Sequence, residues 1–143
     1  LPYLNISYAA ESCITSLPAE IYLQFIKTLI PLYKEDKSFL WGIAWNIKRR
    51  SPNDQLIYLD CLIEQNVNVD IIKKLPILDG PSSWSGSRIP YLKDNLKLIT
   101  EYINSHKHLS ILYRTYLDEL ELKIVDLIKN TEIEEFNDGN LGN

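Results

Sequence analysis

Residues 51–64 read SPNDQLIYLDCLIE and carry the clearest helix start in the chain. Serine is a favoured N-cap, proline suits the first helical position, and an acidic residue three positions after the cap, here Asp54, can bond back to the helix start. Behind this start, apolar residues recur at the spacing of one helix face: Leu56, Leu59, Leu62 and Ile63. The stretch therefore predicts an amphipathic helix.

The same signals predict five further helices around this one. The first is expected to run from Ser16 to Pro31, and the proline ends or kinks it. The other four are expected from Asp36 or Ser38 to Ile47, from Asn68 to Leu75, from Pro90 to Ile103 and from Leu109 to Leu127. The first of them has two adjacent apolar rows, Ile21-Phe25-Leu29 and Tyr22-Ile26-Ile30. Residues 1–16 are ambiguous, and the tail of a preceding helix is one interpretation. No stretch alternates like a half-buried strand, so we predict an all-α fold of about six helices.

Three of the predicted helix starts are marked by proline, at residues 18, 52 and 90. Their separations of 34 and 38 residues match the length of one helix pair in an α-solenoid. This spacing favours stacked helical hairpins of the HEAT type, with a closed helix bundle as the alternative. We expect one domain over residues 1–130 and an acidic, frayed tail over residues 131–143.

Composition limits the classes of partner. The chain has 143 residues, of which 45% are hydrophobic, which is enough for a core. Its formal net charge of −4 comes from the acidic residues of the tail, Glu132, Glu134, Glu135 and Asp138. The rest of the chain is balanced, so we expect no nucleic-acid surface, which would need clustered cations. No apolar run is long enough for a membrane span, so we expect no membrane partner.

The ends and the cysteines bear on cellular context. The sequence lacks methionine and opens Leu1-Pro2-Tyr3, so we interpret it as a fragment of a larger protein. Cys13 and Cys61 are too few and too far apart for a disulfide framework. We interpret both as buried thiols in a reducing compartment, which predicts a cytoplasmic protein.

The most distinctive string is the Trp/Ser/Gly loop from Gly80 to Pro90. Trp84 and Arg88 are residue types that anchor protein interfaces, and the neighbouring hydroxyl and backbone N–H groups could hold an anion or a peptide carbonyl. The alternative is a loop that folds back, with Trp84 plugging the core and serines capping helices. The loop does not match a nucleophile elbow, in which a glycine stands two residues before and two residues after the serine, following a strand. Gly80 fits before Ser82, but Trp84 takes the place of the glycine after it, and no strand precedes the loop.

Trp41 and Trp45 lie one helical turn apart and so share a face, offset from the row of Phe39, Ile43 and Ile47. They either pack on a neighbouring helix pair or form an exposed aromatic ridge. The cations at 48–50 that follow are typical of a helix end, where they complement the helix dipole, and a phosphate clamp is the alternative.

Candidate catalytic groups are few. His106 and His108 are the two histidines of the chain, and a third metal ligand would have to be a carboxylate such as Glu101 or Asp118. The alternative is a solvated turn between helices. With no phosphate-binding glycine-rich loop and no distinctive carboxylate pair, we predict neither an enzyme nor a cofactor or metal.

One resemblance rests on the string Pro81-Ser-Ser-Trp-Ser-Gly-Ser-Arg-Ile-Pro90 and the two amphipathic helices after it. Residues 80–130 resemble the helical, HEAT-like C-terminal regions of large bacterial multidomain proteins, including signal-transducing NTPases of anti-phage defence. The second of these helices departs from that likeness, because with Tyr113 and Tyr116 it is richer in tyrosine than such regions. It implies a scaffold or sensor segment whose ligand is a protein and whose enzymatic part lies elsewhere.

From these observations we predict a non-catalytic α-helical repeat module that mediates protein–protein recognition or scaffolding. Its partner would be another protein or other domains of the same polypeptide, and self-association is possible. The expected contact residues are Trp84 and Arg88, then Trp41 and Trp45. The alternatives are a small acidic inhibitor or immunity-type binder, a structural spacer between domains, and a small metal enzyme that uses His106 and His108.

Overall fold

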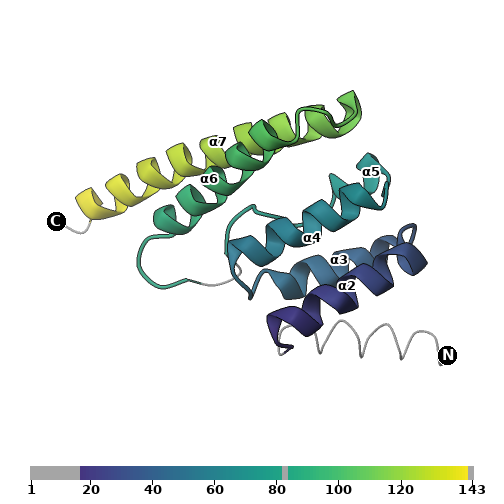
Figure 1. The fold of residues 1–143 in the computed structure, drawn as a ribbon. Coiled ribbons are helices and arrows are strands. Elements are labelled where there is room, and N and C mark those ends of the chain that lie inside the picture. The colour runs from purple at the N-terminus through teal and green to yellow at the C-terminus, as the bar shows by residue number, and fades with distance from the viewer. Residues whose placement is uncertain (1–16, 82–83, 142–143) are drawn as a thin grey trace. The chain divides into compact units, whose positions relative to one another are not determined.

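The computed structural model describes residues 17–81 and 84–141, with the side chains of 139–141 left out. Within these residues every regular element is a helix and none is a strand, which confirms the all-α prediction (Figure 1). The helices are α2 (Ala19–Tyr33), α3 (Lys37–Ile47), α4 (Pro52–Glu64), α5 (Val69–Ile72), α6 (Ile89–Ser105) and α7 (Ile111–Leu141).

The chain forms two compact units, Leu1–Ile77 and Leu78–Asn143, where a single domain was expected. Unit 1 holds α2 to α5, and unit 2 holds α6 and α7. The division follows from local packing, since α6 and α7 have their most extensive contacts with one another. Each unit is described by itself.

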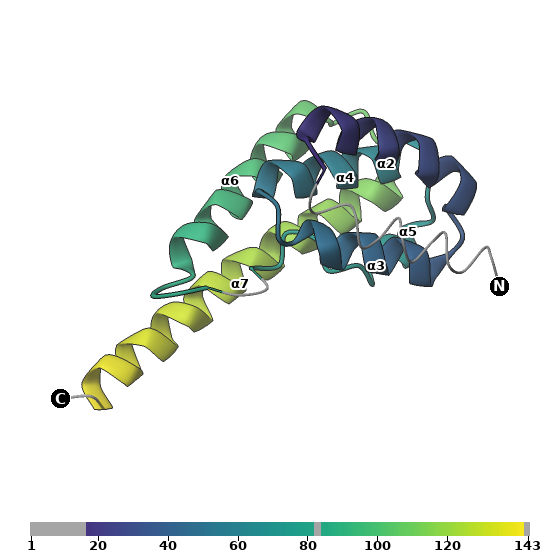
Figure 2. The same cartoon turned by 90° about the horizontal axis from the view of Figure 1, so that it is seen from below.

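The core of unit 1 is shared by α2, α3 and α4, which contact one another in every pairing (Figure 2). Helix α2 turns the row of Tyr22, Ile26 and Ile30 inward, while Ile21 of the adjacent row is 51% exposed. Both rows are apolar, so the sequence alone does not show which row faces the core. Tyr22 decides which row is buried, because its hydroxyl donates to the carbonyl of Asp54 at 3.0 Å.

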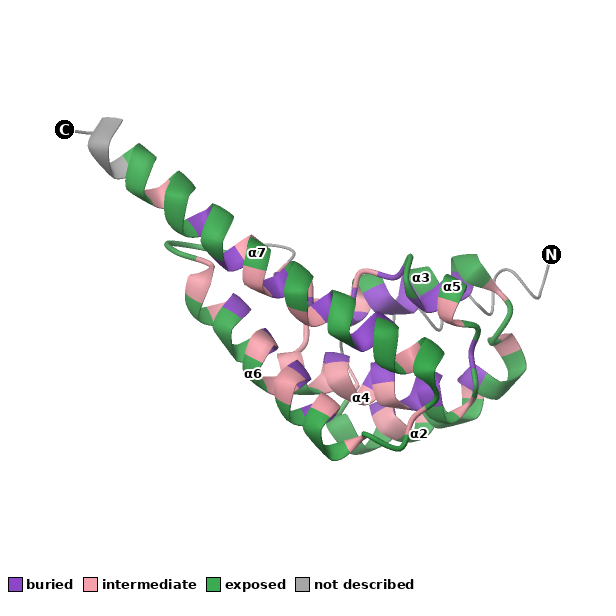
Figure 3. Cartoon of the chain, turned by 90° about the horizontal axis from the view of Figure 1, so that it is seen from above, coloured by how far each residue is buried: buried purple, intermediate pink, exposed green. Residues whose placement is uncertain are grey.

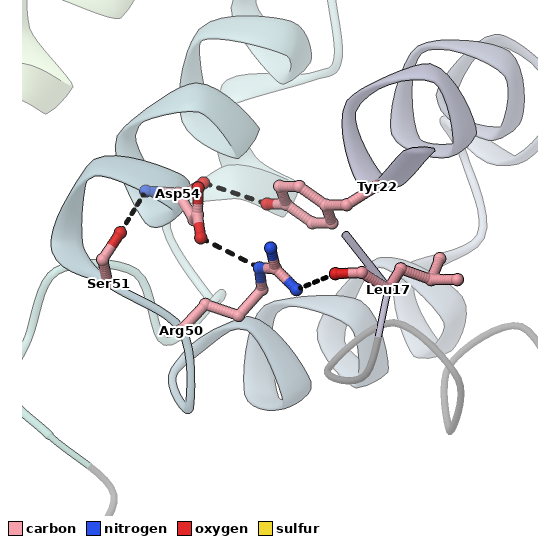
Figure 4. A network of polar contacts seen from close by, with 5 residues as sticks. All are labelled: Leu17, Tyr22, Arg50, Ser51 and Asp54. Carbon is pink, nitrogen blue, oxygen red and sulfur yellow. Dashed lines mark hydrogen bonds and ion pairs between the residues drawn. The ribbon is translucent and has the colours of Figure 1, made fainter. Parts of the chain in front are cut away.

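Arg50 ties the start of α2 to the junction between α3 and α4 (Figure 4). Its Nε donates to the Asp54 carboxylate at 2.9 Å, and its Nη1 donates to the Leu17 carbonyl at 2.9 Å. The guanidinium also lies over the Tyr22 ring, 4.3 Å from its centroid. Burial, and then the nearby Asp54, raises the pKa of Tyr22 well above its usual range, so its hydroxyl stays a donor.

Three helix starts, those of α3, α4 and α5, follow the predicted caps, whereas Ser16, expected as the cap of α2, lies outside the described residues. Asp36, rather than Ser38, accepts from the N–H of Phe39 at 3.0 Å. Ser51 accepts from the N–H of Asp54 at 3.3 Å, and Asn68 caps the short α5 through the N–H of Asp70 at 2.8 Å.

Two details of these helices differ from the sequence-based expectation. The Asp54 carboxylate binds Arg50 instead of bonding back to the helix start, and α2 continues past its internal Pro31 to Tyr33.

Unit 2 is a pair of helices of unequal length. α6 has 17 residues and α7 has 31, or about 25 Å against about 45 Å at a rise of about 1.5 Å per residue. Thr100 of α6 donates to the Glu121 carboxylate of α7 at 2.7 Å. Because α7 is longer, its C-terminal end extends beyond α6, as Figures 1 and 2 show.

The expected frayed tail is therefore helical as far as Leu141, and this part of the prediction was wrong. The acidic stretch contains glutamates, which are good helix formers, and it continues a helix that has already been nucleated. Thr131, at its start, is only 3% exposed and accepts from Arg88 Nε at 3.1 Å. Figure 3 shows how buried and exposed residues alternate along α7.

We predict that Arg50→Ala lowers the free energy of unfolding by about 2–3 kcal/mol, because it leaves Asp54 and the Leu17 carbonyl without their charged donor. Arg49→Ala is the matched control, since Arg49 is exposed at the same helix end, and it should cost less than about 0.5 kcal/mol. Urea denaturation followed by circular dichroism measures both. Equal losses for the two variants would contradict the role given to Arg50.

A second prediction concerns Asn95, which is fully buried on α6. Within the described part of the chain, neither its Oδ1 nor its Nδ2 has a hydrogen-bond partner. Asn95→Leu should therefore raise the free energy of unfolding by about 1–2 kcal/mol, because it removes an unsatisfied buried amide. The exposed Asn104 of the same helix controls for helix propensity, and Asn104→Leu should change stability by only about 0.5 kcal/mol. A loss of stability in Asn95→Leu would show that the amide is satisfied in solution.

Candidate functional site

Unit 1 has an open groove beside Trp41, with a volume of about 340 Å³. It is lined by three residues of α3 and three from α5 and the segment after it: Lys37, Ser38, Trp41, Ile71, Lys74 and Leu75. Ile71 and Leu75 are each only 8% exposed, so they form a fixed apolar floor. A groove of this size and character takes an apolar side chain.

The wall of the groove continues into an exposed aromatic ridge. The rings of Trp41 and Trp45 stack with centroids 5.7 Å apart and planes 3° from parallel. They are 47% and 42% exposed, which favours the ridge over packing on a neighbouring helix pair. Lys48 Nζ lies 5.6 Å from the Trp45 ring centroid, so it extends the same face by one more turn.

The inner face of α3 explains why the tryptophans face outward. Leu40, Ile43 and Ile47 fill the core, and the hydroxyl of Tyr58 on α4 donates to the Leu40 carbonyl at 2.9 Å. These contacts fix the rotation of α3 about its axis. Trp41 and Trp45 are consequently held on its outer side.

Both charged residues that line the groove are lysines. Lys37 and Lys74 line it, and among the described residues neither ammonium group has an ion-pair partner. Both stems border apolar carbon, so their charged heads can lie at the edge of the groove, over the apolar floor. The arrangement suits a segment that presents an apolar side chain flanked by carboxylates.

The Trp/Ser/Gly loop belongs to unit 2. Trp84 is 54% exposed, so the alternative in which it plugs the core was wrong. The Arg88 guanidinium lies 5.2 Å from the Trp84 ring centroid, and its Nε donates to Thr131 of α7. Arg88 thus links the loop to α7, while the Ser87 hydroxyl accepts from the N–H of Ile89 at 3.1 Å. Ser82, considered above as a nucleophile, lies outside the described residues.

The two histidines, considered above as metal ligands, make ring contacts within the chain. His106 stacks on Tyr102 with ring centroids 3.8 Å apart, and its Nδ1 lies 2.9 Å from the Tyr102 carbonyl. Within the described ranges, no three histidine, cysteine or acidic side chains are grouped as metal ligands. Of the cations at 48–50, Arg50 is held in the network of Figure 4.

Five of the six groove residues were missed by sequence reasoning, which singled out Trp41 as a contact residue and considered Ser38 only as a helix cap. Lys37 stands four residues before Trp41, so the helical repeat could have placed both on one face. Ile71, Lys74 and Leu75 give no such signal. They reach the groove only through the packing of the segment that carries α5.

Two further observations bear on function. None of the helices in the described part of the chain is long and apolar enough to cross a membrane. Comparisons with protein-family models, with curated proteins and with solved structures find no match. The geometry of the groove is therefore the basis for a functional proposal.

Cys61 allows a test of thiol reactivity; Cys13 lies outside the described residues. Burial raises the pKa of the Cys61 thiol to about 11, and the nearby Glu64 and Asp60 add to the effect. Only about one thiol in ten thousand is then ionised at pH 7. In a Cys13→Ser background we expect Ellman's reagent to label Cys61 very slowly, with a rate that rises with pH, and to label it at once in denaturant. Rapid labelling of the folded chain at neutral pH would contradict the burial of this thiol.

Proposed function

We propose that the chain is a non-catalytic α-helical module that recognises a segment of another protein through the groove beside Trp41. The observation that carries the proposal is one open hollow with an apolar floor and two lysines, whose wall at Trp41 continues outside it into the exposed Trp41–Trp45 pair. Tryptophan is enriched among the residues that dominate binding energy at interfaces. The preferred segment is a helix or turn that presents an apolar anchor flanked by acidic side chains.

The shape of the groove supports a protein segment over a small metabolite. Enclosed small-molecule sites surround most of the ligand and contain several converging polar groups. This groove is open, its floor is apolar, and its charged groups are two long, flexible lysines. Its aromatic wall also continues outside the hollow through Trp45 and Lys48, which would extend contact along a partner.

The wider proposal is that the helices are stacked as hairpins of the HEAT type in a larger bacterial protein, with a sensor or scaffold role in defence. The support for it is the spacing of the proline-marked helix starts and the likeness of residues 80–130 to such regions. Trp84 is kept as a second contact residue because its ring is 54% exposed. Arg88 would act through Trp84, since it lies over that ring and binds Thr131.

A peptide selection tests the groove. Short random peptides displayed on phage are panned against the immobilised chain, and enriched peptides are labelled and measured by fluorescence anisotropy. We expect enriched sequences to contain an apolar pair beside acidic residues. Trp41→Ala should weaken their binding by about tenfold or more, as expected for an interface anchor.

The matched control is Leu32→Ala, an exposed apolar residue of α2 that does not line the groove, which should leave peptide binding unchanged. Lys37→Glu combined with Lys74→Glu should reverse the preference from acidic to basic peptides. Circular dichroism verifies that each variant folds. Enriched peptides that bind Trp41→Ala as tightly as the unchanged chain would refute the groove as the recognition site.

A further inference from the structure

Helix α7 has a second regular row of side chains, on the side away from its buried residues. Leu117, Ile124 and Thr131 mark the buried side. On the other side, alternating steps of four and three residues give the 3.5-residue repeat with which two helices pack along their lengths. The residues of this repeat are Ile111, Thr115, Asp118, Leu122, Val125, Lys129, Glu132 and Phe136. We refer to these eight residues as the outer row of α7.

The outer row lies on the surface of the chain. Ile111, Leu122 and Phe136 are 66%, 63% and 69% exposed. The three charged members of the row are exposed as well, as the exposed residues along α7 in Figure 3 illustrate. The row is about 38 Å long at a rise of about 1.5 Å per residue. Large apolar side chains that are exposed along such a length are typical of a contact surface.

The order of residues in the outer row is complementary to its own reverse. From either end, the row has an apolar residue, then two polar residues, then an apolar residue at the middle. A second copy can therefore be laid antiparallel against it, with the common centre between residues 123 and 124. At both ends Ile111 then meets Phe136 of the other copy, and at the middle Leu122 meets Val125.

The polar positions between these apolar pairs are complementary too. In the antiparallel alignment Asp118 faces Lys129, and this ion pair occurs twice because the arrangement is symmetric. Thr115 faces Glu132, whose carboxylate can accept a hydrogen bond from the threonine hydroxyl. In a parallel alignment each residue would face its own copy, so Asp118 and Lys129 would both meet like charge. The charges of the row thus select the antiparallel orientation.

We infer that two copies of this chain associate through the outer row of α7, antiparallel and about a two-fold axis. Both copies use the same surface, so the interface is isologous and assembly stops at a dimer. The groove beside Trp41 belongs to unit 1 and takes no part in this interface. The inference therefore goes beyond the proposed function, and either can fail without the other.

The expected association is moderate in strength. Two helices in contact over this length bury roughly 1,200 Å², the lower limit of a standard interface, which places the dissociation constant at about 0.01–0.1 mM. Glu119 and Asp126 border the row on one side, where their charges repel across the pair. Measurements at about 0.15 M salt limit this repulsion, because screening is then effective beyond about 8 Å.

The first test measures the mass of the 143-residue chain by sedimentation velocity and light scattering over about 0.01–1 mM. We expect the mass to rise with concentration from that of a monomer to that of a dimer, and no further. Leu122→Gln should weaken dimerisation about tenfold or more, because it places an amide at the centre of the interface in both copies. Leu32→Gln is the matched control, since Leu32 is 72% exposed on α2, and it should leave the dimer unchanged. Circular dichroism verifies that each variant folds.

The second test exchanges the charges of the ion pairs. Asp118→Lys and Lys129→Asp each place like charges opposite one another at two positions, so either variant alone should dimerise about fivefold to tenfold more weakly. In an equimolar mixture, a copy of one variant restores both ion pairs with a copy of the other. The mixture should therefore dimerise as the unchanged chain does.

The third test reads the orientation by disulfide cross-linking in a Cys13→Ser background, in which the other thiol, Cys61, is buried. Thr115→Cys and Glu132→Cys variants, mixed and oxidised, should cross-link with each other. Either variant alone should not, because its two new thiols are about 26 Å apart in the antiparallel pair, whereas a disulfide requires Cα atoms within about 7 Å.

Several results would overturn the inference. A monomer at the highest concentration would assign the outer row to a different partner. The inference also fails where Leu122→Gln or a single charge variant dimerises like the unchanged chain, or where a cysteine variant cross-links with itself as readily as with the other. Loss of the dimer in Trp41→Ala would assign self-association to the groove instead.

Discussion

The packing of unit 1 depends on the contacts of one group, the Arg50 guanidinium. It is bound by the Asp54 carboxylate and the Leu17 carbonyl, and it lies over the Tyr22 ring. One planar cation thus joins the start of α2 to the start of α4, at the point where the chain leaves α3. A lysine could not take its place equally, because only the guanidinium combines directed donors with a face that stacks on an aromatic ring.

Once α2 and α4 are fixed, α3 has little choice of orientation. Its residues Leu40, Ile43 and Ile47 are buried in the core. A helix with apolar residues on two faces cannot bury both against the same neighbours. The stacked pair Trp41–Trp45 is left outward, and it forms the wall of the groove. The candidate site is therefore a consequence of how the core is packed.

The same reasoning applies to the long helix of unit 2. Helix α7 buries Leu117, Ile124 and Thr131 and leaves Ile133 and Phe136 exposed. Ile133 and Phe136 follow Thr131 by two and five residues, which places them on the face of α7 opposite this buried row. Each unit thus keeps large apolar side chains in water, at Trp41 and Trp45 in unit 1 and at Ile133 and Phe136 in unit 2. Exposed surfaces of this kind are retained where they meet a partner.

Local signals in the sequence determined the helical elements themselves. The caps Asp36, Ser51 and Asn68 were predictable because each helix start satisfies its own N–H groups within a few residues. The end of α7 was missed because acidic residues without a core pattern look the same in a tail and in an exposed helix.

Tertiary structure alone decided which faces turned inward and which residues met. Tyr22 rather than Ile21 points inward because a hydroxyl must find a partner when it is buried, and that partner is 32 residues away. Trp41 could be singled out from the sequence, but its neighbours Ile71 and Lys74 could not. Helical periodicity relates residues within one helix, whereas a groove between segments depends on how those segments pack.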